Sequence, residues 1–186
     1  MPFIPTNIPD LLIFEPKVFE DSRGYFFEAY NTQSFADEGV DIRFVQDNQS
    51  KSSYGVIRGL HYQLNPYAQT KLVRVLEGII LDVAVDIRKG SPTFGQHFAI
   101  ELSAENKKQL LVPQGFAHGF SVLSETAIVL YKCDQLYNKQ SEAGIVFNDP
   151  TLNIDWKLLA NKALVSEKDA LLPRFENCIN NFEFAK

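Results

Sequence analysis

The chain of 186 residues is poor in the residue types that build disulfide frameworks and metal sites, with two cysteines and three histidines. Two thiols cannot form a disulfide framework, so we expect Cys133 and Cys178 to be free thiols in a reducing cytoplasm. No apolar run approaches the roughly 18 residues that a membrane span requires. The first residues also lack the basic start and apolar stretch of a secretory signal. These absences predict a cytoplasmic protein with no membrane partner.

Positive charge is scarce as well, and the formal net charge is -5. Proteins that track nucleic-acid phosphates need a basic surface, so a nucleic-acid partner is not expected. A small anionic ligand is still possible, because it needs only a local cluster of Arg and Lys. Hydrophobic residues make up 45% of the chain, an ordinary share for a globular protein. The length fits one domain over residues 1–186 with a sizeable core.

Short apolar segments separated by Gly, Pro, Asn and Asp dominate the chain. Several alternate with a period of two: in the segment 79–87, Asp82, Ala84 and Asp86 share one face. Aromatic residues, at 12%, and many β-branched residues also favour strands. About ten short strands with regular turns predict an all-β sandwich or barrel. The expected strands are 11–19, 24–30, 42–46, 56–63, 72–76, 79–87, 97–102, 109–112, 115–123 and 127–132.

Helical patterns are few. One short helix is expected at 32–38, with Thr32 or Ser34 near its start. A second is expected to begin near Ser166, because Ser166 and Asp169 have the spacing of a capping box. The segment after about Pro150 is less strand-like, and we expect this tail, 150–186, to pack over the barrel.

Two of the three histidines lie in motif-like surroundings. His118 closes the segment 113–120, a P-x-G-x-x-H pattern similar to the second motif of the cupin superfamily. In metal-binding cupins the first motif contains an H-x-H pair, whereas the corresponding place here reads His61-Tyr62-Gln63. Because glutamine is a poor ligand for transition metals, we expect no metal site.

A histidine in a strand is most often an interior residue whose hydrogen bonds are satisfied, but the sequence places other polar residues in the strands around His61. Arg58, Lys71 and Tyr131 lie in otherwise apolar segments, which is costly unless each finds a partner or a ligand. Arg58 and His61 would point to opposite faces of a regular strand. A bulge at Gly59 would bring them to one side.

Gln46 and Asn48 are two residues apart, so both can point from one strand into the same cavity. Together with His61 and its polar neighbours they indicate a polar site inside an apolar framework. The residues alone leave open whether this site is catalytic or only binds a ligand.

From Glu15 to about Trp156, and again at 166–169, the chain resembles the dTDP-4-dehydrorhamnose 3,5-epimerase family. The matching stretches are 19–28, 46–48, 55–63, 71–75, 82–88, 91–95 and 113–120, followed by Tyr131, Lys132, Tyr137 and Glu142 at family-like spacing. Each motif alone is weak. Their number and order over most of the chain make the resemblance specific.

The resemblance implies a double-stranded β-helix, or jelly-roll (cupin-type), barrel that forms a homodimer and needs no cofactor. It implies conversion of dTDP-4-dehydro-6-deoxy-D-glucose to dTDP-4-dehydro-L-rhamnose, by removal and return of protons at C3 and C5. An epimerase of only one of these carbons would use the same base and acid. A non-catalytic sugar-nucleotide-binding cupin and a metal-dependent oxygenase are further alternatives. The intact catalytic set argues against the first, and Gln63 against the second.

Four residues match the family's chemical groups: His61 the base, Tyr131 the acid, Lys71 a cation for the enolate oxygen, and Asp169 the carboxylate that orients His61. Imidazole titrates near neutral pH and so suits proton abstraction. Each assignment has a simpler alternative: Asp169 as a helix-capping residue, Tyr131 as barrel filling, and Lys71 as a surface charge. Asp82 is the other candidate for orienting His61.

The remaining matches concern substrate binding. Arg23, Arg58 and Lys168 resemble residues that hold the diphosphate and the sugar, and Tyr137 resembles one that stacks on thymine. The full set of expected substrate contacts is Arg23, Phe26, Glu28, Gln46, Asn48, Arg58, Gln63, Lys71, His118, Tyr137, Glu142 and Lys168. In the family the strand from Arg23 to Glu28 reaches the site of the partner subunit. We therefore expect the N-terminal strands, residues 1–30, at the dimer interface.

Overall fold

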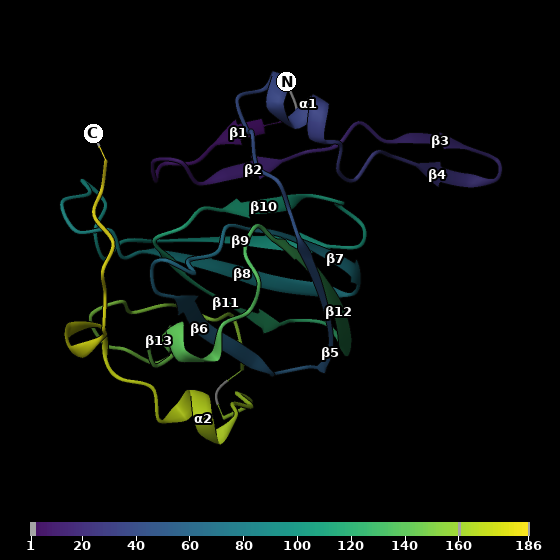
Figure 1. Ribbon diagram of the computed structural model, residues 1–186. Coiled ribbons are helices and arrows are strands. Elements are labelled where there is room, and N and C mark those ends of the chain that lie inside the picture. Colours follow the sequence, from purple (N-terminus) through teal and green to yellow (C-terminus); the bar gives the residue numbers. More distant parts are fainter. Residues whose placement is uncertain (1–2, 160, 186) are drawn as a thin grey trace.

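The computed structural model describes residues 3–159 and 161–185, so residues 1, 2, 160 and 186 of the expected domain lie outside the described residues. Two antiparallel sheets face each other (Figure 1). The first contains, in spatial order, β1 (Phe3–Pro5), β2 (Leu12–Phe14), β10 (Gln109–Val112), β7 (Lys71–Glu77), β12 (Thr126–Cys133) and β5 (Gln46–Ser53). The second contains β13 (Glu142–Gly144), β6 (Ile57–Gln63), β11 (Phe116–Val122), β8 (Ile79–Asp86) and β9 (His97–Ser103). The predicted all-β class is confirmed.

The space between the sheets is filled by apolar side chains from both of them. Val73 and Val129 from the six-stranded sheet belong to the same buried cluster as Ile80, Ala84 and Phe120 from the five-stranded sheet. Burying these side chains supplies the main driving force that holds the two layers together.

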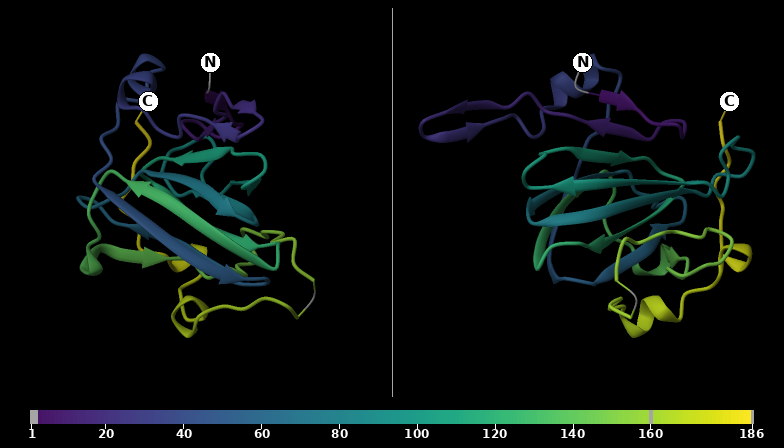
Figure 2. Two further views of the ribbon diagram at one scale, coloured as in Figure 1. Left: turned by 90° about the vertical axis from the view of Figure 1, so that its right-hand side faces the viewer. Right: turned by 180° about the vertical axis from the view of Figure 1, so that it is seen from behind.

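Strand β8 is buried on both faces, which explains its nearly continuous apolar sequence. Ile80 faces the interior between the sheets, whereas Val83 faces outward and packs with Trp156 and Phe182 of the C-terminal tail. The tail also runs beside the body of the molecule in Figure 2 and ends near the level of the N-terminus. It therefore covers the outer face of the five-stranded sheet.

The N-terminal segment packs on the six-stranded sheet. Phe3, Phe14 and Phe35, the last from α1 (Thr32–Asp37), form a buried cluster with Leu72 and Leu111. Between β2 and α1 the chain makes a hairpin of β3 (Phe19–Asp21) and β4 (Gly24–Phe26) that projects away from both sheets (Figure 1).

Helical structure is limited to short pieces in the described part of the chain. Besides α1 there are α2 (Glu167–Ala170) and the 3₁₀ turns η1 (Lys139–Ser141) and η2 (Phe175–Asn177). Both predicted helices are present, and Ser166 caps α2 as expected. Helix α1 begins at Thr32, as expected, and the side chain of Asn31 caps it. Within the described ranges, no helix has the length and apolar character needed to cross a membrane.

Several strand boundaries differ from those expected. The segment 42–46 is not a strand; the strand begins at Gln46 and continues to Ser53 as β5. The segments 11–19 and 24–30 form strands only in part, and β1 and β13 were not expected. Strand β5 reads QDNQSKSS and carries no apolar residues, so hydrophobic alternation could not detect it.

Candidate active site

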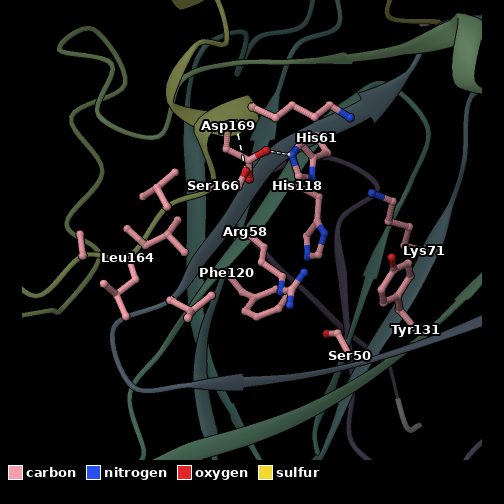
Figure 3. A pocket seen from close by; sticks show the side chains of 15 residues that line it. Ser50, Arg58, His61, Lys71, His118, Phe120, Tyr131, Leu164, Ser166 and Asp169 are labelled. Carbon is pink, nitrogen blue, oxygen red and sulfur yellow. Dashed lines mark hydrogen bonds and ion pairs between the residues drawn. The ribbon is translucent and has the colours of Figure 1, made fainter.

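The four candidate catalytic residues converge from different elements on one cavity of about 720 Å³ (Figure 3). His61 lies on β6, Lys71 on β7, Tyr131 on β12 and Asp169 on α2. A second cavity of about 290 Å³ also contains His61, Lys71 and Tyr131. Its other lining residues are Gln46, Asn48, Tyr62, Gln63, Gln69, Tyr137 and Glu142. His61, Lys71 and Tyr131 therefore lie where the two cavities meet, and Asp169 lines the first cavity only.

A β-bulge in β6 brings Arg58 and His61 to the same side. On β11, His118 pairs with His61 and Phe120 pairs with Arg58. Two steps along β11 therefore correspond to three steps along β6, which has one extra residue. Gly59 in the bulge has φ +123°, a conformation that favours glycine, and a Cβ there would lie 2.5 Å from Cα of Gly119. The predicted bulge is confirmed, and both side chains line the first cavity.

Asp169 forms a close pair with His61. Nε2 of His61 lies 2.8 Å from Oδ1 of Asp169, and the backbone N–H of Gly59 donates to Oδ2 at 3.1 Å. The backbone N–H of Asp169 donates separately to the hydroxyl of Ser166, so capping and pairing with His61 occur together. With Nε2 held by a carboxylate, Nδ1 is the ring nitrogen left to accept a proton.

The carboxyl group of Asp169 is favoured in its ionised form. Burial alone would raise its pKa, but the hydrogen bond and charge of His61 and the N–H of Gly59 outweigh burial, and the pKa falls below its ordinary value. An ionised carboxylate orients the imidazole ring and stabilises its protonated form.

A second carboxylate–imidazole pair lies deeper in the barrel. Nε2 of His118 lies 2.8 Å from Oδ1 of Asp82, and both residues are buried. Asp82 is therefore bonded to His118, and it is Asp169 that contacts His61. Among the described residues, Oδ2 of Asp82 has no hydrogen-bond partner.

Lys71 and Tyr131 lie beside each other on neighbouring strands, as Figure 3 shows. Nζ of Lys71 is 5.9 Å from the centre of the Tyr131 ring. Burial lowers the pKa of the Lys71 ammonium and raises the pKa of the Tyr131 phenol. Tyr131 is thus a neutral hydroxyl at physiological pH, able to donate a proton into the cavity.

Three of the expected substrate contacts are linked at the rim of the cavities. The hydroxyl of Tyr137 donates to Oε2 of Glu142 at 3.0 Å, and Nζ of Lys168 lies 2.6 Å from Oε1 of the same carboxylate. These bonds join the segment before η1, strand β13 and helix α2 across the opening.

The other expected contacts within the body of the chain also reach the cavities. Gln46 donates to Oδ1 of Asn48 at 3.0 Å, which confirms that the two share a face. Arg58 donates to the hydroxyl of Ser52, and His118 lines the first cavity. Gln63 lines the second cavity, but its amide is bonded to backbone groups of the loops around it.

Arg23, Phe26 and Glu28 lie outside the two cavities. Arg23 is paired with Asp21 at the exposed tip of the β3–β4 hairpin. Phe26 and Glu28 line a separate hollow formed with residues of the segments 14–19 and 31–35. Within one chain these three side chains do not join His61.

Some lining residues were missed by sequence reasoning. Ser50 follows Gln46 and Asn48 at a spacing of two, so recognising β5 would have identified it. The first cavity also has an apolar wall of Val56, Phe120 and the segment 163–165, and such residues carry no chemical signal in a sequence. Among the described residues, no group of three or more His, Cys, Asp or Glu side chains could hold a metal ion.

The two facing sheets and the meeting of an imidazole–carboxylate pair with a lysine and a tyrosine agree with the cupin-type sugar epimerases that the sequence resembles. The chain matches the sequence model of dTDP-4-dehydrorhamnose 3,5-epimerase over residues 5–177. It is 56% identical to the dTDP-4-dehydrorhamnose 3,5-epimerase of Shigella flexneri over 170 residues, which cover 91% of this chain and 93% of the relative. The chain belongs to the dTDP-4-dehydrorhamnose 3,5-epimerase family and is an isomerase.

Two solved structures support the same assignment. The dTDP-4-dehydrorhamnose 3,5-epimerase of Elizabethkingia anophelis matches with a TM-score of 0.90 and 56% identity, covering 94% of this chain and 96% of that one. The dTDP-6-deoxy-D-glucose-3,5-epimerase of Legionella pneumophila, solved with dTDP-4-keto-L-rhamnose, matches with a TM-score of 0.86 and 49% identity over 93% and 97% of the chains. The family resemblance and the cupin-type fold expected from the sequence are confirmed.

Proposed function

We propose that this chain converts dTDP-4-dehydro-6-deoxy-D-glucose to dTDP-4-dehydro-L-rhamnose, with His61 as the base and Tyr131 as the acid. The observation that carries the proposal is the meeting of the His61–Asp169 pair with Lys71 and Tyr131 at the junction of two cavities. The substrate, the residue roles and the dimer described below are parts of this proposal.

The ketone at C4 makes the hydrogens at C3 and C5 acidic, because removal of either leaves an enolate. Nδ1 of His61 takes the proton, and the electron pair of the broken C–H bond moves toward the C4 oxygen. The imidazolium that forms is stabilised by the carboxylate of Asp169, 2.8 Å from Nε2. Lys71 stabilises the negative charge that develops on the C4 oxygen.

Inversion requires that the new proton arrive from the opposite face of the sugar ring. Tyr131 donates it from β12, which lies in the other sheet from His61, and the enolate electron pair forms the new C–H bond. The phenolate left on Tyr131 and the imidazolium of His61 then exchange protons with solvent before the second carbon reacts. One base and one acid therefore serve both centres in turn.

The nucleotide is bound by the polar groups around the two cavities. Arg58 and Lys168 bring positive charge to the first cavity, which suits a diphosphate. Tyr137, which is 55% exposed, offers a face on which the thymine ring can stack. Gln46, Asn48, Glu142 and His118 add further polar contacts.

A homodimer completes the site with Arg23, Phe26 and Glu28 of the partner chain. The projecting β3–β4 hairpin supports this part of the proposal, because Phe19, Tyr25 and Phe26 expose large apolar surfaces on it. We also place the reaction in the cytoplasm, which the two free thiols support.

Proton NMR of dTDP-4-dehydro-6-deoxy-D-glucose in heavy water tests the reaction directly. We expect deuterium to enter at both C3 and C5, and the product to be accepted by a reductase that forms the L-rhamnose nucleotide. Label at only one carbon, with inversion there, would identify a single-centre epimerase. Binding without exchange at either carbon would indicate a non-catalytic sugar-nucleotide-binding protein.

A further inference from the structure

The segment that carries Tyr137 has little to hold it in place except side-chain hydrogen bonds. Residues 134–138, between β12 and η1, belong to no strand or helix. Leu136 is 64% exposed and Tyr137 55% exposed, so apolar burial contributes little to fixing this segment. Without other restraints such a loop would sample many conformations.

Gln63 supplies these restraints from beneath the loop. Its Nε2 donates to the carbonyl of Leu136 at 3.3 Å and to the carbonyl of Tyr67 at 2.7 Å. Its Oε1 accepts from the backbone N–H of Asn138 at 2.7 Å. One side-chain amide thus binds the residue before Tyr137, the residue after it, and a second loop.

The position of Gln63 makes these bonds effective. The residue is only 4% exposed, so breaking its bonds would leave polar groups without water to replace the lost partners. It is the last residue of β6 and pairs with Glu142 of β13, the carboxylate that accepts from the hydroxyl of Tyr137. Gln46 adds a third restraint, since its Oε1 accepts from the N–H of Tyr137 at 3.0 Å.

We infer that Gln63 is a positioning residue for nucleotide recognition. It holds the loop 136–138 in the conformation in which the ring of Tyr137 can stack on a nucleobase. The inference rests on the proposed function, in which Tyr137 stacks on the base. Because the loop is already ordered before the ligand binds, binding does not have to include the entropic cost of ordering it. It also explains why this position needs an amide, which donates and accepts at once, where metal-binding cupins carry a histidine ligand.

The test compares Gln63→Met, which keeps the length of the side chain and removes its hydrogen bonds, with the wild type. We expect the KM for the sugar nucleotide and the Kd for dTDP, from calorimetry, to rise roughly tenfold. The kcat should stay within about twofold, because His61, Lys71, Tyr131 and Asp169 are unchanged. Gln63→Glu, which keeps the acceptor for Asn138 but loses the donor, should weaken dTDP binding as well.

Gln114→Met is the matched control. Gln114 donates to Asp134 at the far end of the same segment and lines neither cavity, so its loss should leave KM, kcat and Kd unchanged. Urea unfolding of each variant separates affinity from stability, and Gln63→Glu keeps the test open if Gln63→Met does not fold.

Tyr137→Ala separates failure of this inference from failure of the proposed function. If Tyr137→Ala weakens dTDP binding and both Gln63 variants bind normally, only the positioning role of Gln63 is overturned. If Tyr137→Ala itself leaves the Kd for dTDP unchanged, the proposed stacking on Tyr137 is wrong, and the inference falls with it. A fall in kcat at constant KM in the Gln63 variants would also overturn it.

Discussion

His61 and His118 lie opposite each other on paired strands, and each is bonded to its own carboxylate. Their surroundings nevertheless differ. The side chain of His61 is 34% exposed, whereas that of His118 is 8% exposed and its partner Asp82 is fully buried. A base must reach both its substrate and the solvent that takes away its proton, and only His61 meets both conditions. This difference supports the choice of His61 as base.

Variants that lack the proposed base and the proposed acid should lose activity in different ways. His61→Ala removes the base, so we expect no deuterium exchange at C3 or C5 and a loss of turnover of roughly 10²–10⁴-fold. Tyr131→Phe keeps the base and the cation that stabilises the enolate. Exchange should therefore continue while inversion nearly stops, because protons return mostly to the face they left. NMR in heavy water measures both rates; inversion by Tyr131→Phe at the wild-type rate would show that Tyr131 is only packing.

At the level of single residues, the sequence motifs pointed to four candidate groups that line one cavity, but not to all of their contacts. Residue types and the family resemblance pointed to Asp169, yet a separation of 108 positions from His61 carries no geometric information by itself. The choice between Asp169 and Asp82 depended on how α2 folds back beside β6. Gln63 was expected among the substrate contacts, and its bonds to backbone groups appear only in the folded chain.

At the level of elements, strands with a buried face could be predicted, including β6, β7 and β12, which carry His61, Lys71 and Tyr131, whereas the polar strand β5 could not. β8, β10 and β11 lie close to their expected bounds because each is a short, mostly apolar run between turn residues. β5 is an edge strand that turns Gln46, Asn48 and Ser50 toward the cavities. The polar residues that line the cavities also mean that β5 has no hydrophobic pattern by which a strand could be predicted.

The bulge in β6 is the element on which the site depends most directly. In Gly59→Ala the new Cβ would lie 2.5 Å from Cα of Gly119 and 2.8 Å from the carbonyl oxygen of His118. We expect a loss of unfolding free energy on the order of 3 kcal/mol and a strong fall in kcat, because the bulge places Arg58 and His61 together.

Gly90→Ala is the control for Gly59→Ala. Gly90 has φ +80° but no atom within 4 Å of its Cβ position, so it carries the backbone penalty without the steric clash. Its cost should be only about 1 kcal/mol, with kcat unchanged. Urea unfolding and turnover of both variants check the comparison; equal costs would mean that close packing of β6 on β11 contributes nothing.

At the level of the whole molecule, one chain brings together the candidate catalytic residues but not all of the expected binding residues. His61, Lys71, Tyr131 and Asp169 meet within the chain, whereas Arg23, Phe26 and Glu28 lie on or beside a hairpin that points away from it. No pattern of apolar residues could predict this separation, because it depends on where the hairpin is directed. A second copy that receives the hairpin would reunite the two groups.

Mixing two inactive variants tests this arrangement. Arg23→Ala lacks the hairpin's cation, and His61→Ala lacks the base, so each homodimer should have little activity. In a mixed dimer one site combines an intact hairpin with an intact His61, while the other site has lost both. After free exchange at equal concentrations half of the dimers are mixed, and one of their two sites works, so activity should recover to about a quarter of the wild-type value. Mass spectrometry of differently tagged chains confirms that exchange has occurred. If mixed dimers form and turnover stays at the level of the separate variants, each site is built from a single chain.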